Sequence, residues 1–482
     1  MKLCDLLQDV VILEAKADLN MEISAVAYDS RKVTPGGLFV AISGFAADGN
    51  RFIPMAMEKG ACAVVTAKKP KEEVPYILVE DDRLALALIG RNFYDRPAES
   101  MTLIGVTGTN GKTSTTLILK QVLERMTGCK AGLIGTMENQ IGDEVIPTER
   151  TTPESFELQG LFARMRDAGC KYAIMEVSSH AIALNRVGGV RFDVAAFTNL
   201  TEDHLDFHKT MENYCDTKAQ LFARCDAAVL NLDDAWFERM GRLASCPIVT
   251  TSAKAEAGIY VRHLQLKADG IDLTAVSDGI CYDITMPIPG RFTVYNTLSV
   301  LGIVKALGLD LAQAAQALTY VRGVKGRIEV VPTPGKDYTV LIDYAHTPDG
   351  LENVLHSVRD FCKGRLIAVF GCGGDRDPIK RPIMGRIGVE LSDIAIITSD
   401  NPRTEDPAAI IRDVVAGVEE GVGTYKIIEN RRKAIEYAMD IGRKDDIIVL
   451  AGKGHETYQE INGVKHHLDE REEVAAYLQG KR

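Results

Sequence analysis

The stretch IGVTGTNGKTSTT, residues 104–116, decides how this chain folds. An apolar strand runs into a glycine-rich turn, after which the sequence becomes helix-like in STTLILKQVLERM. Backbone N–H groups in such a turn surround phosphate oxygens, and the N-terminus of the following helix favours the anion. The predicted phosphate-binding loop comprises Gly108, Thr109, Asn110, Gly111, Lys112, Thr113 and Ser114.

This loop predicts ATP as the ligand more firmly than it predicts a reaction. Lys112 would reach the β- and γ-phosphates, and the hydroxyl of Thr113 would hold Mg²⁺. The general form of the motif needs glycine where Val106 stands, so only the shorter G-T-N-G-K-T form is present. A chance glycine-rich turn is the alternative, but strand, turn and helix follow here in the required order.

Composition limits the classes of partner. The 482 residues predict roughly three domains. A net charge of −11 argues against nucleic acids and anionic membranes as partners. No apolar run reaches the ~18 residues of a membrane span, and the N-terminal MKLCDLLQDV lacks a signal-peptide core. Ten cysteines without a C-x-x-C pair predict reduced, mostly buried thiols in a cytoplasmic protein.

We expect the chain to divide into three domains, residues 1–98, 99–332 and 333–482. The boundaries are set by two polar, turn-forming segments, YDRPAES at 94–100 and VPTPGKD at 331–337. In the middle piece, the apolar runs TLIGV, YAIMEV, DVAAFT and AAVLN alternate with helix-like stretches. This pattern predicts a largely parallel sheet covered by helices on both faces. Residues 258–290 alternate apolar and polar side chains, which predicts a small antiparallel sheet.

The last piece repeats the α/β pattern, and polar clusters follow its four strand candidates. The clusters are AHTPDG, CGGDRDP, SDNPRTEDP and KGHETY. Because ligands bind beyond the carboxyl ends of strands in open α/β sheets, we expect the four clusters to face one crevice. Ordinary loop polarity is the alternative.

Candidate metal ligands follow two strands of the middle piece. Glu176 ends a strand, where a second Mg²⁺ ligand beside the loop would be needed. His204 lies in the acidic segment TNLTEDHLDFH, which could equally be a metal site, a zinc site or a solvated loop. Lys218 lies in the helix-like MENYCDTKAQLF and, taken alone, is a solvated helix lysine.

Together these motifs resemble the Mur ligase family. GTNGKTS, MEVSSH, TNLTEDHLDFH, GRFTVYNTLSV, GRIE and DYAHTP occur in the family's order, and the resemblance covers essentially the whole chain. YDSRKVTPGGLFVAISGFAADGNRF and TTPES resemble the members that add the third residue of a peptide. The resemblance implies an α/β fold of three domains: uridine-nucleotide-binding, central P-loop ATPase and C-terminal Rossmann-like.

The resemblance also implies a reaction. ATP phosphorylates the free carboxylate of UDP-N-acetylmuramoyl-L-alanyl-D-glutamate, and the amine of meso-diaminopimelate attacks the acyl phosphate. The setting is cytoplasmic peptidoglycan precursor synthesis by a monomer. Alternatives are a lysine-adding ligase, a folylpolyglutamate synthetase, a P-loop switch or motor, and a catalytically dead binding protein.

The resemblance assigns roles around ATP. Thr113 and Glu176 would hold one Mg²⁺ and His204 another, with Lys112 as a further catalytic residue. Lys218 would carry a carbamate formed from CO₂, which requires a neutral amine and therefore a lowered lysine pKa.

Three more residues match ATP contacts of the family, and each has a plainer alternative. Asn296 could cap a helix, Arg327 could pair with Glu329, and Asp343 could be turn polarity at a strand end.

The matches to the nucleotide-sugar site lie mostly in loops. Arg150 and Leu184 depart from the expected pattern there, because asparagine and glutamine are common at those positions. The matching residues are Ser30, Phe45, Ala46, Ala47, Thr151, Thr152, Ser178 and Arg186.

The segment DNPR is the family's diaminopimelate signature. Arg403 can hold the distal carboxylate through two parallel hydrogen bonds, whereas lysine would leave the guanidinium unpaired. A surface ion pair of Arg403 with Glu405 or Asp406 is the alternative. Asp400 and Asn401 would meet the neighbouring ammonium, and Pro402 would fix the turn. The matching residues are Arg376, Asp400, Asn401, Pro402, Arg403, Gly452 and Glu456.

Overall fold

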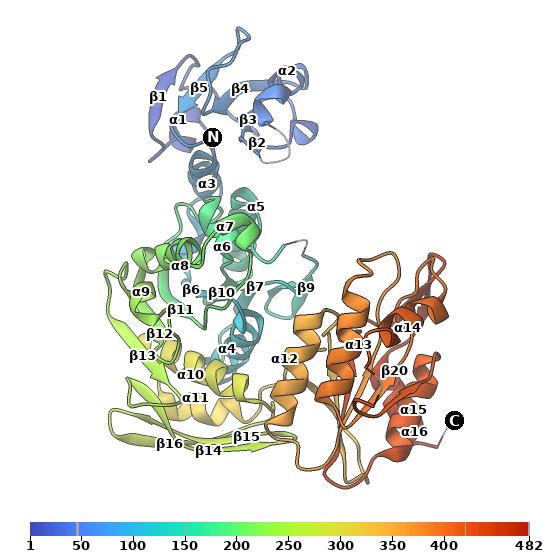
Figure 1. The fold of residues 1–482 in the computed structure, drawn as a ribbon. Coiled ribbons are helices and arrows are strands. Elements are labelled where there is room, and N and C mark those ends of the chain that lie inside the picture. Colours follow the sequence, from blue (N-terminus) through green and yellow to red (C-terminus); the bar gives the residue numbers. More distant parts are fainter. Residues whose placement is uncertain (45–47, 149, 420, 481–482) are drawn as a thin grey trace. The chain divides into compact units, whose positions relative to one another are not determined.

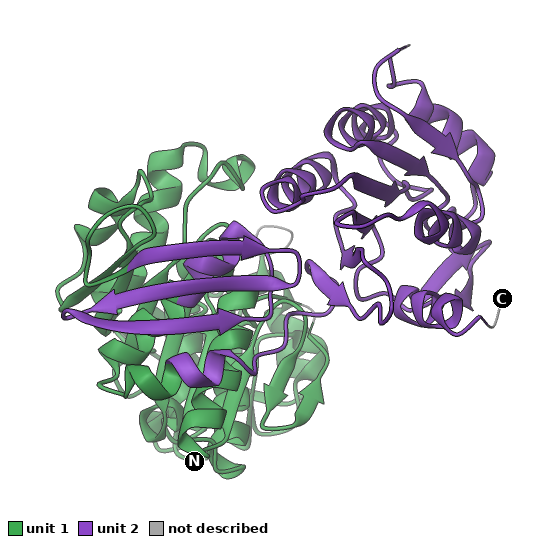
Figure 2. Ribbon diagram, turned by 90° about the horizontal axis from the view of Figure 1, so that it is seen from below, with its two compact units in different colours: residues 1–260, 298–314 green, residues 261–297, 315–482 purple. Residues whose placement is uncertain are grey.

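The computed structural model describes residues 1–44, 48–148, 150–419 and 421–480. The chain forms two compact units (Figure 2), residues 1–260 with 298–314 and residues 261–297 with 315–482. Helices α10 (Arg291–Ala306) and α11 (Leu311–Leu318) belong partly to each unit. No helix among the described residues is long and apolar enough to cross a membrane.

Unit 1 begins with a five-stranded sheet in the order β1-β5-β4-β3-β2 (Figure 1), in which only β1 runs antiparallel to its neighbour. Apolar side chains of α1 and α3 pack on one face of the sheet, and those of α2 pack on the other. The elements are β1 (Ile12–Ala15), β2 (Ala25–Ala27), β3 (Gly37–Ala41), β4 (Ala61–Thr66), β5 (Tyr76–Val79), α1 (Leu3–Leu6), α2 (Ile53–Glu58) and α3 (Asp82–Phe93).

The second sheet of unit 1 is parallel from β7 through β10, β6, β11, β12 and β13 to the first residues of β14. Strands β8 and β9 add an antiparallel edge. The strands are β6 (Thr102–Thr107), β7 (Ala131–Ile134), β8 (Asn139–Ile141), β9 (Glu144–Ile146), β10 (Tyr172–Glu176), β11 (Phe192–Phe197), β12 (Cys225–Asn231), β13 (Ile248–Ser252) and β14 (Ile259–Lys267). The predicted parallel sheet is therefore confirmed.

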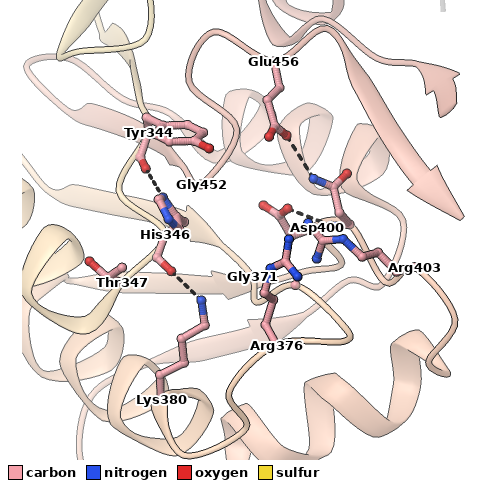
Figure 3. Close-up of a pocket in the computed structure, with 12 residues that line it drawn as sticks. Tyr344, His346, Thr347, Gly371, Arg376, Lys380, Asp400, Arg403, Gly452 and Glu456 are labelled. Carbon is pink, nitrogen blue, oxygen red and sulfur yellow. Dashed lines mark hydrogen bonds between the residues drawn. The ribbon is translucent and has the colours of Figure 1, made fainter. Parts of the chain in front are cut away.

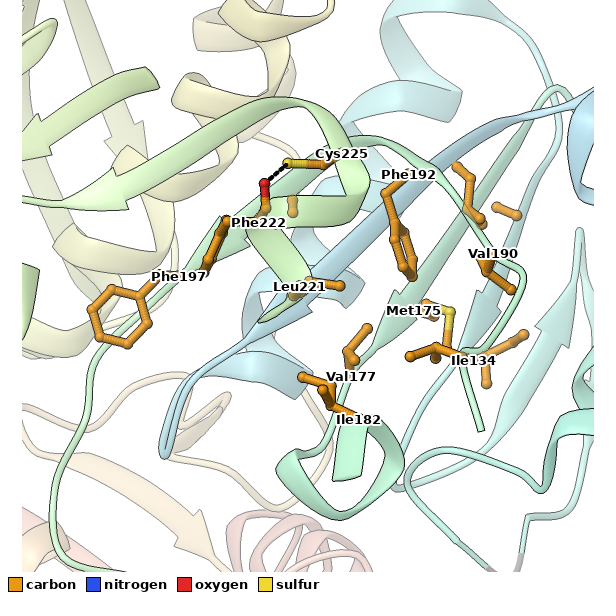
Figure 4. Packing of buried hydrophobic residues seen from close by; sticks show 14 of the residues in the cluster. Ile134, Met175, Val177, Ile182, Val190, Phe192, Phe197, Leu221, Phe222 and Cys225 are labelled. Atoms are coloured by element: carbon orange, nitrogen blue, oxygen red, sulfur yellow. Dashed lines mark hydrogen bonds between the residues drawn. The ribbon is translucent and has the colours of Figure 1, made fainter. Parts of the chain in front are cut away.

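The core of this sheet explains why its strands are almost wholly apolar. Strand β10 is buried along its whole length, as expected for parallel strands covered on both faces. Phe192 packs with Met175 and Val177 in the main cluster (Figure 4), and a Cβ at Gly105 would approach the Phe192 ring to 2.8 Å. The helices are α4 (Lys112–Thr127), α5 (Ser155–Asp167), α6 (Ser179–Ala183), α7 (Leu205–His208), α8 (Met211–Ala219) and α9 (Phe237–Gly241).

Unit 2 opens with most of β14, from Val261 onward, and the antiparallel pair β15 (Gly270–Ser277) and β16 (Ile280–Met286). These strands confirm the small antiparallel sheet predicted for residues 258–290. The rest of unit 2 is a six-stranded sheet in the order β17-β18-β22-β19-β20-β21, in which only β17 is antiparallel. The strands are β17 (Glu329–Val331), β18 (Thr339–Asp343), β19 (Leu366–Phe370), β20 (Ile394–Ile397), β21 (Tyr425–Ile427) and β22 (Ile447–Ala451).

Helices cover both faces of the six-stranded sheet. Apolar residues of α12, α13 and α14 pack on one face, and those of α15 and α16 pack on the other. A hairpin of β23 (Tyr458–Ile461) and β24 (Val464–His467) follows β22. The helices are α12 (Pro348–Arg359), α13 (Lys380–Leu391), α14 (Pro407–Val415), α15 (Arg431–Ile441) and α16 (Glu470–Leu478).

All ten cysteines are free thiols, but the prediction that most are buried is wrong. Only four are buried, because several cysteines lie at strand ends and in loops rather than inside the sheets. The buried cysteines are Cys170, Cys215, Cys225 and Cys372.

Candidate functional site

The glycine-rich loop of unit 1 contains two glycines with positive φ angles and leads directly into a helix. Gly108 and Gly111 have φ angles of 146° and 84°, and α4 begins directly afterwards at Lys112. The Lys112 ammonium donates to the carbonyl oxygens of Gly108 and Thr109, both at 2.8 Å. Lys112 is therefore folded over its own loop, and burial lowers its pKa.

The carboxylate of Glu176 lies directly beside this loop. Thr113 donates its hydroxyl proton to Oε2 at 3.0 Å, and the backbone N–H of Thr136 donates to Oε1 at 2.8 Å. The structure thus brings together the two residues predicted to share one Mg²⁺. Their oxygen atoms suit Mg²⁺, which keeps water and phosphate oxygens as its other ligands.

Lys218 reaches the same loop from α8. Its ammonium donates to the carbonyl oxygen of Gly108 at 2.9 Å, the atom that also accepts from Lys112. Only 1% of Lys218 is exposed, so the solvated-lysine interpretation is wrong. Burial, followed by the positive charge of Lys112, lowers the pKa of Lys218 well below its usual value.

His204 lies in a turn with a φ of 54°, immediately before α7. Its Nε2 is 3.4 Å from a carboxylate oxygen of Asp203, and its ring centroid is 4.8 Å from that of His180. Tyr214 links this histidine to the loop. Its hydroxyl lies 3.2 Å from Thr109 Oγ1, and its ring packs edge-on to His204. No pattern in the sequence pointed to Tyr214.

The structure describes five of the eight residues predicted to contact the nucleotide sugar, Ser30, Thr151, Thr152, Ser178 and Arg186. Thr152 and Ser178 lie beside the end of β10, because the Thr152 hydroxyl donates to the backbone carbonyl of Glu176 at 2.8 Å and the Ser178 backbone N–H donates to Thr152 Oγ1 at 3.2 Å. Thr151 accepts a hydrogen bond from Thr136, and Ser30 is buried at the start of a short 3₁₀ turn. Phe45, Ala46 and Ala47 lie outside the described residues.

Arg186 belongs to a cluster of positive charge that the sequence did not reveal. It donates to the Thr152 carbonyl at 3.2 Å and lies 3.4 Å from Glu154. Arg83 and Arg150 approach the same buried carboxylate to 3.6 and 3.8 Å. Three guanidinium groups therefore surround one glutamate, and this excess of positive charge suits an anionic ligand. Arg150 and Leu184 are the two departures from the expected pattern. Arg150 takes part in this arginine cluster, whereas Leu184 caps the C-terminal end of α6.

Gly108→Ala is expected to abolish nucleotide binding and to lower the melting temperature. A Cβ at this position would lie 1.9 Å from Thr198 Oγ1, and the φ of 146° is one that alanine rarely adopts. Strain of this kind costs about 1–3 kcal/mol before the clash is added. The matched control is Gly128→Ala at the other end of α4, where φ is 68° and no atom lies within 4 Å. Thermal unfolding with and without ATP checks both variants, and normal ATP stabilisation of Gly108→Ala would contradict the assignment.

Unit 2 contains a pocket of about 260 Å³ (Figure 3). Every one of the four polar clusters predicted to meet contributes to its wall, so that expectation is confirmed. The pocket lies at the carboxyl ends of β18, β19, β20 and β22. Its lining residues are Tyr344, His346, Thr347, Gly371, Gly373, Arg376, Lys380, Asp400, Asn401, Arg403, Gly452 and Glu456.

The Arg403 guanidinium converges with that of Arg376 in the pocket (Figure 3). Arg403 Nη1 donates to the Gly374 carbonyl at 2.7 Å, and Nε lies 3.4 Å from Glu460. Glu405 instead accepts from Arg381, so the ion pair of Arg403 with Glu405 is wrong. Two like charges directed into one pocket favour an anionic ligand group.

Asp400 and Asn401 supply the opposite polarity. Asp400 Oδ1 accepts from the Asn401 backbone N–H at 2.7 Å, while the buried Oδ2 has no hydrogen-bond partner among the described residues. The side-chain amide of Asn401 donates to Glu456 Oε2 at 2.9 Å. The buried Pro402 follows directly. This part of the pocket therefore suits a cation such as an ammonium group.

The structure describes the surroundings of the three remaining residues predicted to contact ATP, Asn296, Asp343 and Arg327. Asn296 is buried within α10, so the helix-cap alternative is wrong. Asp343 accepts from the backbone N–H groups of Ile328 and Ala345 at 2.8 and 2.9 Å, and burial raises its pKa. Arg327 lies over the Tyr344 ring at 5.6 Å.

Glu329 takes Arg471 as its partner, so the pairing of Glu329 with Arg327 is also wrong.

Sequence comparisons identify the family. The model of the Mur ligase middle domain matches residues 106–304. The model of the Mur ligase glutamate ligase domain matches residues 326–454, and that of the Mur ligase family catalytic domain matches residues 22–94. A Clostridium acetobutylicum protein named UDP-N-acetylmuramoyl-L-alanyl-D-glutamate--2,6-diaminopimelate ligase 1 is 47% identical over 481 residues, covering 99% of each chain. The chain belongs to the Mur ligase family.

Solved Mur ligase structures share the fold. One titled as a UDP-N-acetylmuramoyl-L-alanyl-D-glutamate--2,6-diaminopimelate ligase is 31% identical, with a TM-score of 0.79, and covers 100% of this chain and 99% of its own. The Thermotoga maritima MurF ligase in complex with ADP is 17% identical, with a TM-score of 0.60, over 95% of this chain and 98% of its own. At that identity, the likeness to MurF shows the fold alone.

Proposed function

We propose that this Mur ligase adds meso-diaminopimelate to UDP-N-acetylmuramoyl-L-alanyl-D-glutamate, with ATP converted to ADP and phosphate. Family membership supports an ATP-dependent amide ligase, and the names of its relatives support this substrate pair. The observation that carries the proposal is the pocket of unit 2, where Arg376 and Arg403 meet Asp400 and Glu456. An amino acid with a carboxylate and an ammonium at each end matches this pattern of charge.

The pocket favours diaminopimelate over lysine because of Arg403. Diaminopimelate carries a distal carboxylate that can accept two parallel hydrogen bonds from a guanidinium. Lysine lacks that group, so binding lysine would bury the guanidinium without its partner. A site built around such a polar group rejects the analogue that lacks it by up to about 10⁴–10⁵-fold.

The loop of unit 1 is the proposed site of carboxylate activation. A carboxylate is a poor acyl donor because its oxygen is a poor leaving group, and phosphorylation corrects this. Lys112 and the loop N–H groups would bind the phosphates, while Thr113 and Glu176, whose side-chain oxygen atoms lie 3.0 Å apart, would hold Mg²⁺. Mg²⁺ supplies charge neutralisation at the transferred phosphoryl group. We propose His204 as a ligand of a second Mg²⁺.

Lys218 is the proposed site of carbamylation. The ammonium first loses one proton to give the neutral amine. The nitrogen lone pair then forms the N–C bond with CO₂, one C=O π pair moves onto oxygen, and loss of a second proton from nitrogen leaves a carbamate anion. Burial and the charge of Lys112 favour the neutral amine that this step requires. The resulting anion would face Lys112 across the loop, because both side chains reach the Gly108 carbonyl.

The nucleotide-sugar substrate would lie along Thr152, Ser178 and Arg186. Thr152 hydrogen-bonds to the Glu176 backbone and also to Ser178 and Arg186, and Arg186 lies beside Glu154. A peptide carboxylate bound near Glu176 would therefore lie within reach of the arginine cluster around Glu154. We place the reaction in the cytoplasm and retain the prediction of a monomer.

One assay tests the proposal. Purified protein is incubated with ATP, Mg²⁺ and UDP-N-acetylmuramoyl-L-alanyl-D-glutamate, together with meso-diaminopimelate, L-lysine or L-glutamate, and phosphate release and product mass are measured. We expect product with diaminopimelate and at least a hundredfold lower rate with lysine. Equal use of lysine would indicate a lysine-adding ligase. Phosphate release without an amino acid would indicate a switch or motor, and product with folate and glutamate a folylpolyglutamate synthetase.

A further inference from the structure

A lysine behind the pocket wall has no place in the proposed reaction. Lys453 follows β22 in the turn that leads to Glu456, and none of its surface is exposed. A fully buried lysine is rare, because removing an ammonium group from water is costly unless other groups compensate it. Lys453 therefore has to be explained by the groups around it.

The Lys453 ammonium joins two loops that lie far apart in the sequence. It donates to Asn401 Oδ1 at 3.0 Å, in the loop after β20, and to Glu456 Oε2 at 3.2 Å, in the loop after β22. The Asn401 amide in turn donates to Glu456 Oε2 at 2.9 Å, and its oxygen also accepts from the Glu460 backbone N–H. Because an ammonium only donates, these contacts fix which way the Asn401 amide points.

Asp400 lies against the same lysine. Its Oδ1 is 3.9 Å from the Lys453 ammonium, whereas its Oδ2 has no hydrogen-bond partner among the described residues. A Cβ at Gly452 would approach Oδ2 to 2.6 Å, and the guanidinium of the fully buried Arg431 lies 3.8 Å from the same oxygen. One oxygen of Asp400 is thus held in place and the other is left free, at a wall of the pocket.

Lys453 also separates two like charges. Lys453 lies 3.9 Å from Asp400 and 3.2 Å from Glu456. Without its charge, the repulsion between the two carboxylates would be stronger and would drive them apart. The resulting movement would displace the wall of the pocket rather than the loop that binds ATP, which lies in unit 1.

We propose that Lys453 is a positioning residue of the amino-acid pocket. It holds Asp400, Asn401 and Glu456 so that they present their remaining oxygen atoms to an ammonium group of the incoming amino acid. Lys453 would not touch the amino acid itself. This inference rests on the proposed function, because it assumes an amino acid with a second ammonium group as the ligand.

The test is the Michaelis constant of each substrate in Lys453→Met, which keeps the length of the side chain and removes its charge. We expect KM for diaminopimelate to rise at least tenfold, while KM for ATP and for the nucleotide sugar stays within twofold of wild type. Lys433→Met, at an exposed lysine of α15 in the same unit, is the matched control and is expected to leave all three constants unchanged.

A second variant keeps the test decisive if Lys453→Met fails to fold. Lys453→Gln retains a hydrogen-bond donor without the charge, and we expect it to raise KM for diaminopimelate by a smaller factor. An unchanged KM for diaminopimelate, or an equal rise in all three constants, would show that Lys453 only supports the fold and would overturn the proposal. Failure of the wild type to use diaminopimelate would instead overturn the proposed function.

Discussion

Lys218→Met is expected to lower kcat by roughly 10²–10³-fold, the range seen when one preorganised electrostatic group of an active site is removed. Methionine fills the same buried space but cannot take up CO₂. The ammonium of wild-type Lys218 already lies 2.9 Å from the Gly108 carbonyl, so the variant loses a group beside the phosphate loop. Phosphate release at saturating substrates measures the effect.

Two further measurements separate loss of a carbamate from loss of a buried lysine. Wild type in buffer stripped of bicarbonate is expected to lose activity and to regain it when bicarbonate is added, and ¹³C-labelled bicarbonate should give a carbamate signal that Lys218→Met lacks. Lys130→Met, at a lysine with only a weak contact to the Ala168 carbonyl, is the control. Full activity of Lys218→Met would contradict the proposed role.

Arg403→Ala is expected to lower kcat/KM for diaminopimelate more than any other change in unit 2. Removing one partner of a buried, hydrogen-bonded charge pair costs about 2–5 kcal/mol, which corresponds to roughly 30- to 5,000-fold. Arg403→Lys keeps the charge but loses the planar fork, so an intermediate loss is expected. Steady-state kinetics with diaminopimelate and with lysine measure the ratio between the two amino acids.

The use of lysine is the informative readout for Arg403. If the guanidinium holds the distal carboxylate, the alanine variant should lose its preference while its low rate with lysine stays the same or rises. Arg412→Ala, at an exposed arginine of α14 that lies 3.6 Å from Asp406, is the matched control. Undiminished use of diaminopimelate by Arg403→Ala would remove the specificity argument.

The features that the sequence predicted correctly are short in range. The strand, turn and helix around Lys112 are contiguous, and glycines at the two positive-φ positions of the turn leave few other conformations. The common crevice of the four polar clusters follows from a general property of parallel sheets, because the carboxyl ends of neighbouring strands meet at one edge. Neither prediction required knowledge of distant contacts.

The features that the sequence did not reveal depend on distant packing. Lys218 becomes buried only when α8 packs against a loop 110 residues earlier. Lys453 belongs to a polar cluster that could be predicted to line a pocket, but its own burial follows from Asn401, which is supplied by another strand end. Glu154 attracts Arg83 and Arg186 from distant segments, in addition to Arg150, which lies four residues before it. Secondary-structure propensity and hydrophobic periodicity carry no information about contacts between segments that lie far apart in the sequence.

The six-stranded sheet of unit 2 has a consequence for how the amino-acid preference of this enzyme could evolve. The side chains that line the pocket come from that sheet's own connections, whereas the glycine-rich loop lies in unit 1. The proposed choice of amino acid is therefore encoded apart from that loop. Exchanging these connections between relatives should transplant the preference for one cell-wall monomer over another. Selection could therefore change the preferred amino acid at this edge of the sheet while leaving the glycine-rich loop of unit 1 unchanged.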